Sequence, residues 1–375
     1  MKNESKTRGI YVTKPYLPEM EEYVSMLSSI WESGVLTNGG AYHQALEQEL
    51  CAHLGIGNLS LVCNGTLALE LAIQALEIKG KIITTPYSFV ATAASILQKG
   101  LEPVFVDIED GGFNLDPELI GDALDGRVGA IMPVHVYGIP CRRERIEEIA
   151  RDRGLKVIYD AAHAFGVELE GKSVLNWGDA STLSFHATKV FHTFEGGAVV
   201  CRNPELRRQI ELRKNFGYEN WEVHCLGSNA KLSEAQAAMG LVMLRHLERI
   251  MNLRKKRFEL YCARLENVTG IKTLIIPGGV KHNYSYFPIL VGAEFPLSRD
   301  ELFDRFIAQE IYPRKYFHPA ITDLSPYREF KIISRHKVPN ARRAAEAVIC
   351  LPLYPDISES DVNRICDVIL QARQG

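Results

Sequence analysis

One lysine stands in a setting where its amine could do chemistry. Lys189 closes the segment Ser184-Phe185-His186-Ala187-Thr188-Lys189, which follows an apolar run, and Glu195-Gly196-Gly197 comes a few residues later. Glycine lets a backbone approach closely, so these glycines can pack behind the lysine. A lysine that is partly removed from water has a lowered pKa and can form a Schiff base with an aldehyde. Since most loop lysines are solvated surface charges, the hypothesis needs support from other residues.

Asp160 is a second candidate, because it ends the apolar run Lys156–Asp160. It could cap a following helix, or it could be the counter-ion of a protonated ring nitrogen. Two unit charges about 4 Å apart at an effective dielectric near 20 attract by on the order of 4 kcal/mol. That attraction would raise the pKa of the nitrogen by roughly 3 units. Pyridoxal phosphate (PLP) needs such a partner, because its protonated ring is an electron sink for the substrate.

Two further segments could bind the rest of such a cofactor. Cys63-Asn64-Gly65-Thr66 indicates a strand end, a glycine turn and a helix start. The N–H groups and dipole of a helix N-terminus attract anions, and the Thr66 hydroxyl adds a donor, although ordinary helix capping would use the same residues. Phe89 follows the next strand and could stack on a planar ring, or it could be a core residue.

Short apolar runs alternate with helix-length segments through the first part of the chain. This alternation predicts an α/β fold with a mostly parallel sheet, in which ligands bind at the carboxyl ends of the strands. A periodic stretch at 232–267 predicts one extended or kinked helix that leads from a large domain (1–250) into a smaller α+β domain (251–375). The expected strands are 59–63, 81–84, 103–107, 129–133, 156–160, 181–185, 197–201 and 284–291, and the other expected helices are 18–33, 42–54, 66–79, 88–99, 116–125, 142–153, 297–309 and 358–373.

Composition argues against several classes of protein. The chain has 375 residues, of which 46% are hydrophobic and 24% charged, as in a soluble globular protein. The net charge of −3 gives no electrostatic reason to expect nucleic acid or membrane as a partner. No apolar run approaches the roughly 20 residues of a membrane span, and the polar start at residues 1–6 lacks a secretory signal. Eight single cysteines without a CxxC pair favour reduced thiols in the cytoplasm over zinc or disulfides, so no metal is expected.

The rival nucleotide-binding folds lack their motifs. Gly55-Ile56-Gly57-Asn58-Leu59-Ser60 has serine in place of the third glycine of a dinucleotide fingerprint, and it precedes a strand instead of following one. No GxxxxGKS/T phosphate loop occurs in the chain.

Taken in order, these motifs resemble those of the DegT/DnrJ/EryC1/StrS family of PLP-dependent sugar aminotransferases. The resemblance runs from Gly34–Gly39 to Leu351-Pro352-Leu353 and implies the aspartate-aminotransferase fold, PLP fold type I. Its specific parts are Asn64-Gly65-Thr66, Pro86–Thr92, Pro103–Asp107, Asp160–His163, Ser184–Lys189 with Glu195–Gly197, and 227–234.

The resemblance implies a role for each matching residue. Lys189 would carry the PLP and move the proton, Asp160 would hold the ring nitrogen, and Phe89 would stack on the ring. His163, at a position where many members have glutamine, would lie near the ring's 3-hydroxyl. Gly65, Thr66 and Ser184 would hold the phosphate. In a homodimer, Asn229 would reach the phosphate in the other subunit.

The same comparison addresses the substrate. Lys315, Tyr316 and His318 fall where the family contacts the nucleotide-sugar, and Lys231, often arginine in the family, has no assigned role. Relatives that dehydrate sugars carry histidine in place of Lys189, so amine transfer is favoured. Residues 159–165 and 185–197 are most similar to members that aminate dTDP-4-dehydro-6-deoxy-D-glucose at C4, with L-glutamate as donor. Amination at C3, a GDP- or UDP-linked sugar, and a non-catalytic PLP-binding regulator stay as alternatives.

Overall fold

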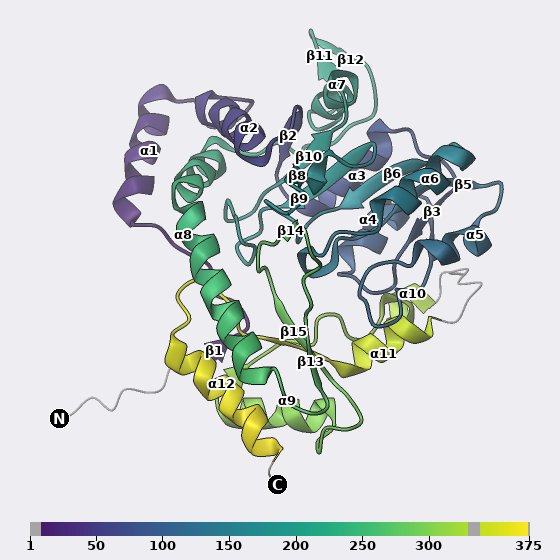
Figure 1. Ribbon diagram of the computed structural model, residues 1–375. Helices are drawn as coiled ribbons and strands as arrows, with labels where there is room; N and C mark the ends of the chain where they lie inside the picture. The colour runs from purple at the N-terminus through teal and green to yellow at the C-terminus, as the bar shows by residue number, and fades with distance from the viewer. Residues whose placement is uncertain (1–8, 329–337, 374–375) are drawn as a thin grey trace.

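A seven-stranded sheet forms the core of the N-terminal half of the computed structural model, the upper part in Figure 1. The structure describes residues 9–328 and 338–373, so the polar start at residues 1–6 lies outside the described residues. Only β10 runs antiparallel to its neighbours in this sheet, which confirms the predicted α/β fold with a mostly parallel sheet. In spatial order the strands are β2 (Leu59–Val62), β10 (Gly197–Cys201), β9 (Ala180–Ser184), β6 (Lys156–Asp160), β5 (Val128–Met132), β3 (Lys81–Thr84) and β4 (Glu102–Phe105).

The sheet is covered on both faces because neighbouring residues of each buried strand point to opposite sides. Ile82 and Ile158 belong to one apolar cluster, while Ile83 and Tyr159 belong to another. The first cluster includes residues of α3 (Gly65–Ala75) and α7 (Pro204–Arg213). The second includes residues of α2 (Ala41–Leu54), α5 (Ile120–Ala123) and α6 (Arg143–Arg153). The remaining helices of this half are α1 (Met20–Ser33) and α4 (Ala91–Gln98).

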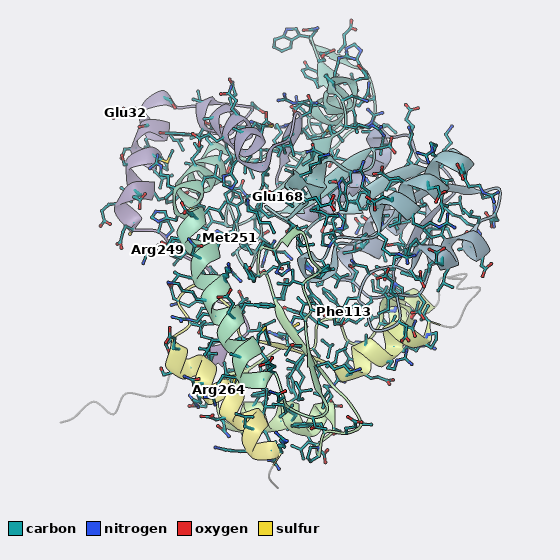
Figure 2. The ribbon with its side chains drawn as sticks, viewed as in Figure 1. Glu32, Phe113, Glu168, Arg249, Met251 and Arg264 are labelled. Carbon is teal, nitrogen blue, oxygen red and sulfur yellow. The ribbon has the colours of Figure 1, made fainter. Side chains whose placement is uncertain are left out.

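The longest described helix, α8 (Glu234–Leu265), connects the two halves of the molecule (Figure 1). Ser233 and Gln236 form a capping box at its start, which satisfies donors that the first turn leaves open. Its first half packs on α1 and α2, and its second half on α12 (Glu359–Ala372). Near its end lies Arg264, which is labelled in Figure 2. Its guanidinium binds Asp367 of α12 at 2.5 Å. The predicted boundary at residue 250 falls inside this unbroken helix.

The C-terminal part has its own apolar cluster around a three-stranded antiparallel sheet. Its strands are β13 (Ile271–Thr273), β15 (Phe287–Val291) and β17 (Val348–Leu351), and its other helices are α9 (Arg299–Ala308), α10 (Ser325–Arg328) and α11 (Pro339–Ala347). Four short pairings complete the fold, and they use β1 (Ile10–Tyr11), β16 (Ile311–Tyr312), β7 (Glu168–Leu169), β8 (Lys172–Ser173), β14 (Val280–Lys281), β11 (Tyr218–Glu219) and β12 (Glu222–Val223).

Several predicted elements are shorter in the structure. The strand expected from residue 284 begins at Phe287, because Tyr284 has a positive φ of 51° that an extended strand does not allow. The helix expected at 116–125 divides into a 3₁₀ turn at Pro117–Leu119 and α5. Strand β17 and helix α11 were not predicted. Among the described helices, none combines the length and the hydropathy that a bilayer crossing requires.

Candidate active site

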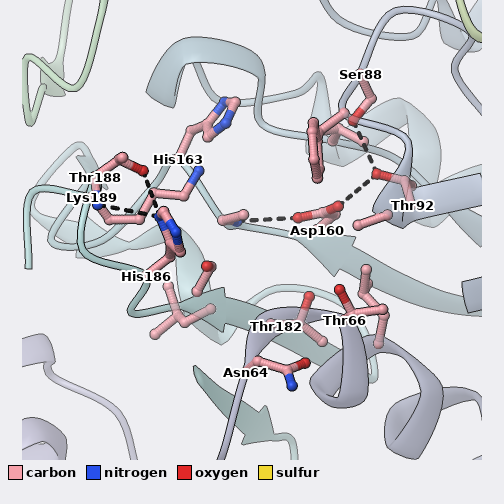
Figure 3. Close-up of a pocket in the computed structure, with 18 of the residues that line it drawn as sticks. Asn64, Thr66, Ser88, Thr92, Asp160, His163, Thr182, His186, Thr188 and Lys189 are labelled. Carbon is pink, nitrogen blue, oxygen red and sulfur yellow. Dashed lines mark hydrogen bonds between the residues drawn. The ribbon is translucent and has the colours of Figure 1, made fainter. Parts of the chain in front are cut away.

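A cavity of about 290 Å³ opens where β6 and β9 end and α3 begins. It is at the carboxyl edge of the sheet, where ligands bind in folds of this kind. The side chains of Lys189, Asp160, His163 and Thr66 lie around it (Figure 3). Eight of the predicted site residues line it, namely Gly65, Thr66, Phe89, Asp160, His163, Ser184, Lys189 and Tyr316.

One side of the cavity is built to receive an anion. Asn64 caps α3, and its Oδ1 accepts a hydrogen bond from Leu67 N at 2.8 Å. The N–H groups of Gly65 and Thr66 belong to the first turn of α3. N–H groups in this turn have no carbonyl partner within the helix. Gly65 packs so closely on β9 that an added Cβ would lie 2.8 Å from Ser184 Cβ. The turn, the Thr66 hydroxyl and the Ser184 hydroxyl at the end of β9 therefore line one space with hydrogen-bond donors. Such a space is a suitable cradle for a phosphate.

Asp160 ends β6 inside the cavity and is only 5% exposed. Its Oδ2 accepts from the Thr92 hydroxyl at 2.8 Å, and its Oδ1 accepts from Ala162 N at 3.1 Å. Burial raises the pKa of Asp160, while these two hydrogen bonds and the charge of Lys189 lower it. A buried carboxylate with unused lone pairs suits a protonated ring nitrogen.

Lys189 reaches the same cavity from the loop after β9. Burial lowers the pKa of its amine to about 8, against the opposing effects of Asp160 and Tyr316. Its Nζ donates to the hydroxyl of Tyr286 at 3.4 Å. An amine with a pKa near neutrality supplies both the neutral form that attacks an aldehyde and the charged form that returns a proton.

His163 is fixed by the backbone. Its Nδ1 accepts from Tyr137 N at 3.2 Å, so the proton of the neutral ring is on Nε2. Burial, and next the charge of Lys189, lower the pKa of His163 well below its ordinary value. The ring also stacks on Phe317, with centroids 5.8 Å apart. His163 is therefore a neutral hydrogen-bond donor next to Lys189.

The rim of the cavity is more open. Phe89 is 58% exposed, so one face of its ring is free to cover a planar ligand. On the opposite loop His186 Nδ1 contacts the Thr188 hydroxyl at 2.8 Å, and its Nε2 lies 3.5 Å from Glu195. Behind this loop an added Cβ on Gly197 would lie 2.7 Å from the carbonyl carbon of Asn64, which shows why the paired glycines are needed.

Three predicted residues do not line the cavity. Asn229 is exposed, and its backbone forms an isolated bridge with Asn215. Lys315 turns its Nζ to Asp300 at 2.5 Å and lies over the ring of Phe303. His318 is exposed next to these residues. Of the predicted substrate residues, only Tyr316 faces the cavity.

Other lining residues were not singled out from the sequence. Thr92 ends the motif Pro86–Thr92, and its spacing of one helical turn from Ser88 is a signal that could have indicated it, since the two hydroxyls lie 2.9 Å apart. Tyr286 and Phe317 come from the C-terminal half and had no local signal. Their position depends on how the two halves pack.

Comparisons with known proteins identify the family of the chain. The profile of the DegT/DnrJ/EryC1/StrS aminotransferase family matches residues 18–370. A dTDP-4-amino-4,6-dideoxy-D-glucose transaminase of Shigella dysenteriae is 48% identical over 98% of this chain and 100% of its own length. The Escherichia coli transaminase of the same name is 44% identical over 97% and 98%. The solved structure of DesI in the presence of its TDP-sugar product covers 98% of this chain and 94% of that one, with 30% identity and a TM-score of 0.93.

The fold and the site together define a PLP-dependent sugar aminotransferase. The chain belongs to the DegT/DnrJ/EryC1/StrS aminotransferase family, as the sequence resemblance predicted. The residues present fit the cofactor: the α3 cradle suits its phosphate, Asp160 its ring nitrogen, and Lys189 its aldehyde. When bound, PLP supplies the electron sink that stabilises a carbanion on the substrate.

Proposed function

We propose that this chain transfers the amino group of L-glutamate to C4 of dTDP-4-dehydro-6-deoxy-D-glucose, giving dTDP-4-amino-4,6-dideoxy-D-glucose. The observation that carries the chemistry is the placement of Lys189 and Asp160 in one cavity with the N-terminus of α3. The choice of sugar is supported by two relatives, 48% and 44% identical along almost their whole length, that carry the name of this product.

The chain's own residues then have separate tasks. Lys189 would hold the cofactor, and its Nζ, once free, would take up and return the proton. Asp160 would keep the ring nitrogen protonated, because it supplies a buried negative charge in the cavity. Gly65, Thr66 and Ser184 hold the phosphate, and Phe89 covers the ring. His163, with its proton on Nε2, would supply a hydrogen-bond donor for the ring's 3-oxygen.

The test is an assay of half-reactions with the purified protein. The visible absorption of bound PLP should be bleached by L-glutamate and restored by dTDP-4-dehydro-6-deoxy-D-glucose, and mass and NMR spectra should show the amine at C4. Lys189→Ala should abolish turnover, with Lys172→Ala as the control, because Lys172 is an exposed lysine on β8. A protein that binds no PLP, or full activity in Lys189→Ala, would disprove the proposal.

The same assay separates the alternatives. Amination at C3 places the new amine on a different carbon in the NMR spectrum, and a GDP- or UDP-linked sugar would be the better substrate in a direct comparison. A non-catalytic PLP-binding regulator would retain the absorption band but transfer no amine in a single turnover. Each of these results would replace the proposed substrate or activity.

We also propose that the enzyme is a cytoplasmic homodimer in which Asn229 completes the partner's phosphate site. Asn229 is exposed and outside its own cavity. It follows an exposed hairpin, β11–β12, that carries Trp221 at 89% exposure and Val223 at 68%, and such apolar exposure is typical of an interface. The eight cysteines are free thiols, as suits a reducing compartment.

Mixing two inactive variants tests the shared site. If Asn229 acts across the interface, a refolded mixture of Lys189→Ala and Asn229→Ala chains should regain activity, because one site of each mixed dimer keeps both residues. A mixture that stays as inactive as its components, or a chain that sediments as a monomer, would contradict the homodimer with shared sites.

A further inference from the structure

Tyr286 is the residue that the C-terminal half brings to Lys189. It precedes β15, and its hydroxyl lies 3.4 Å from Lys189 Nζ. Lys189 Nζ is the one partner among the described residues to which this hydroxyl is hydrogen bonded. One charged group, Asp160 at the end of β6, also faces the amine. Two titratable side chains, His163 and Tyr316, face it from loops.

The backbone on both sides of Tyr286 is attached to the large half of the molecule. Asn283 Nδ2 donates to the carbonyls of His163 at 2.8 Å and Phe165 at 3.0 Å, on the loop that follows Asp160. Ser285 Oγ donates to the carbonyl of Tyr137 at 3.1 Å. These bonds fix Tyr286 relative to the loop that carries His163, so its hydroxyl has a defined place in the cavity.

The ring of Tyr286 is held from several directions as well. Its centroid lies 4.8 Å from that of His163, 5.9 Å from that of Tyr137 and 5.9 Å from that of Tyr316. Tyr316 is nearly perpendicular to it, at 89°. A ring packed between three others cannot swing away, so the hydroxyl meets the amine without a further cost in side-chain entropy.

A phenol is well matched to an amine that changes its protonation state. The phenol oxygen accepts a hydrogen bond from a charged ammonium, and its O–H donates to the lone pair of a neutral amine. Burial raises the pKa of Tyr286 well above its ordinary value, so the hydroxyl keeps its own proton in both cases. A carboxylate in this place could only accept, and it would stabilise only the charged lysine.

We propose that Tyr286 is a positioning residue for Lys189. The Tyr286 hydroxyl holds the Lys189 amine, in both protonation states of that amine, whenever the amine is not joined to the cofactor. The inference rests on the proposed role of Lys189, because an amine that moves a proton must stay near the reacting atoms. It extends that role to a second residue, contributed by the other half of the molecule.

The direct test is the titration of Lys189 in the cofactor-free protein, by NMR of ¹³C-labelled lysine side chains. The signal of Lys189 is assigned as the one lost in Lys189→Ala. A hydrogen bond to a charged group is stronger than one to a neutral group, so losing the hydroxyl should lower the pKa of Lys189 by about one unit in Tyr286→Phe. Tyr284→Phe is the matched control, because that tyrosine lies two residues away and does not line the cavity.

Kinetics give a second readout. In Tyr286→Phe the affinity for PLP and the KM for glutamate should change by less than about threefold, while kcat falls about tenfold, as expected for the loss of one hydrogen bond to a charged group. A role in stability alone would lower the unfolding temperature and leave the pKa of Lys189 unchanged. An unchanged pKa in a folded Tyr286→Phe protein would overturn the inference. The titration needs no turnover, so it decides this point even if the proposed substrate is wrong.

Discussion

The hydroxyl of Thr92 donates to Asp160 Oδ2 across 2.8 Å, and so the start of α4 holds the carboxylate at the end of β6 (Figure 3). Ser88 Oγ lies 2.9 Å from Thr92 Oγ1, which lets Ser88 donate to Thr92 in turn. Both Thr92 and Ser88 are buried. This chain of hydroxyls orients the carboxylate and keeps its pKa lower than burial alone would set it.

Asp160→Asn should retain the contact with Thr92 but lose the charge. The ring nitrogen of PLP would then lose an attraction on the order of 4 kcal/mol at an effective dielectric near 20, so turnover should fall on the order of 10³-fold. The protein should keep its fold and bind PLP, as seen by its absorption. If Asp160→Asn turned over at close to the wild-type rate, the counter-ion role would have to be abandoned.

Thr92→Val should have a smaller effect with a distinct pH signature. The hydrogen bond from Thr92 lowers the pKa of Asp160, so its loss should raise that pKa. Because Asp160 must be charged, and activity is lost as the pH falls through its pKa, the acid limb of the pH–activity profile should move to higher pH. The loss at the optimum should be about 10- to 100-fold, the value of a hydrogen bond to a charged group.

Ser95→Ala is the control for Thr92→Val. Ser95 lies on the same helix and its Oγ donates to the carbonyl of Thr92, without contact to Asp160. Its pH profile should match the wild type. An acid limb that stays in place in Thr92→Val would show that Thr92 does not tune the carboxylate.

The tautomer of His163 can be observed directly. Because Nδ1 accepts from Tyr137 N, ¹⁵N NMR should show the proton on Nε2. Burial lowers the pKa of His163 well below its ordinary value, so the ring should stay neutral between about pH 5 and 8, where ordinary histidines titrate. A His163 signal that titrates in this range would contradict this assignment.

The sequence could predict the part of the site that lies at strand ends. Asp160 ends a buried strand and Thr66 and Lys189 follow others, and parallel strands bring their carboxyl ends to one edge. Tyr286 could not be predicted in this way, because its place depends on bonds such as Asn283 to His163 that join distant segments. The ion pair of Lys315 with Asp300 on α9 could not be predicted for a related reason, because a local motif does not specify such a partner.

Gly197→Ala should weaken PLP binding without touching the cofactor. The added Cβ would lie 2.7 Å from the carbonyl carbon of Asn64 and 2.8 Å from the carbonyl oxygen of Leu183. Both are backbone atoms that cannot rotate away, so the turn that starts α3 must shift, at a cost of about 1–3 kcal/mol for an overpacked core. A displaced turn no longer aims the N–H groups of Gly65 and Thr66 at one point.

We therefore expect Gly197→Ala to bind PLP at least about tenfold more weakly, which corresponds to about 1.4 kcal/mol. The affinity is measured by titration of the cofactor-free protein. Gly57→Ala is the matched control, because an added Cβ there meets no atom within 4 Å. Equal PLP affinity in the two variants would show that the close approach of β10 does not shape the phosphate cradle.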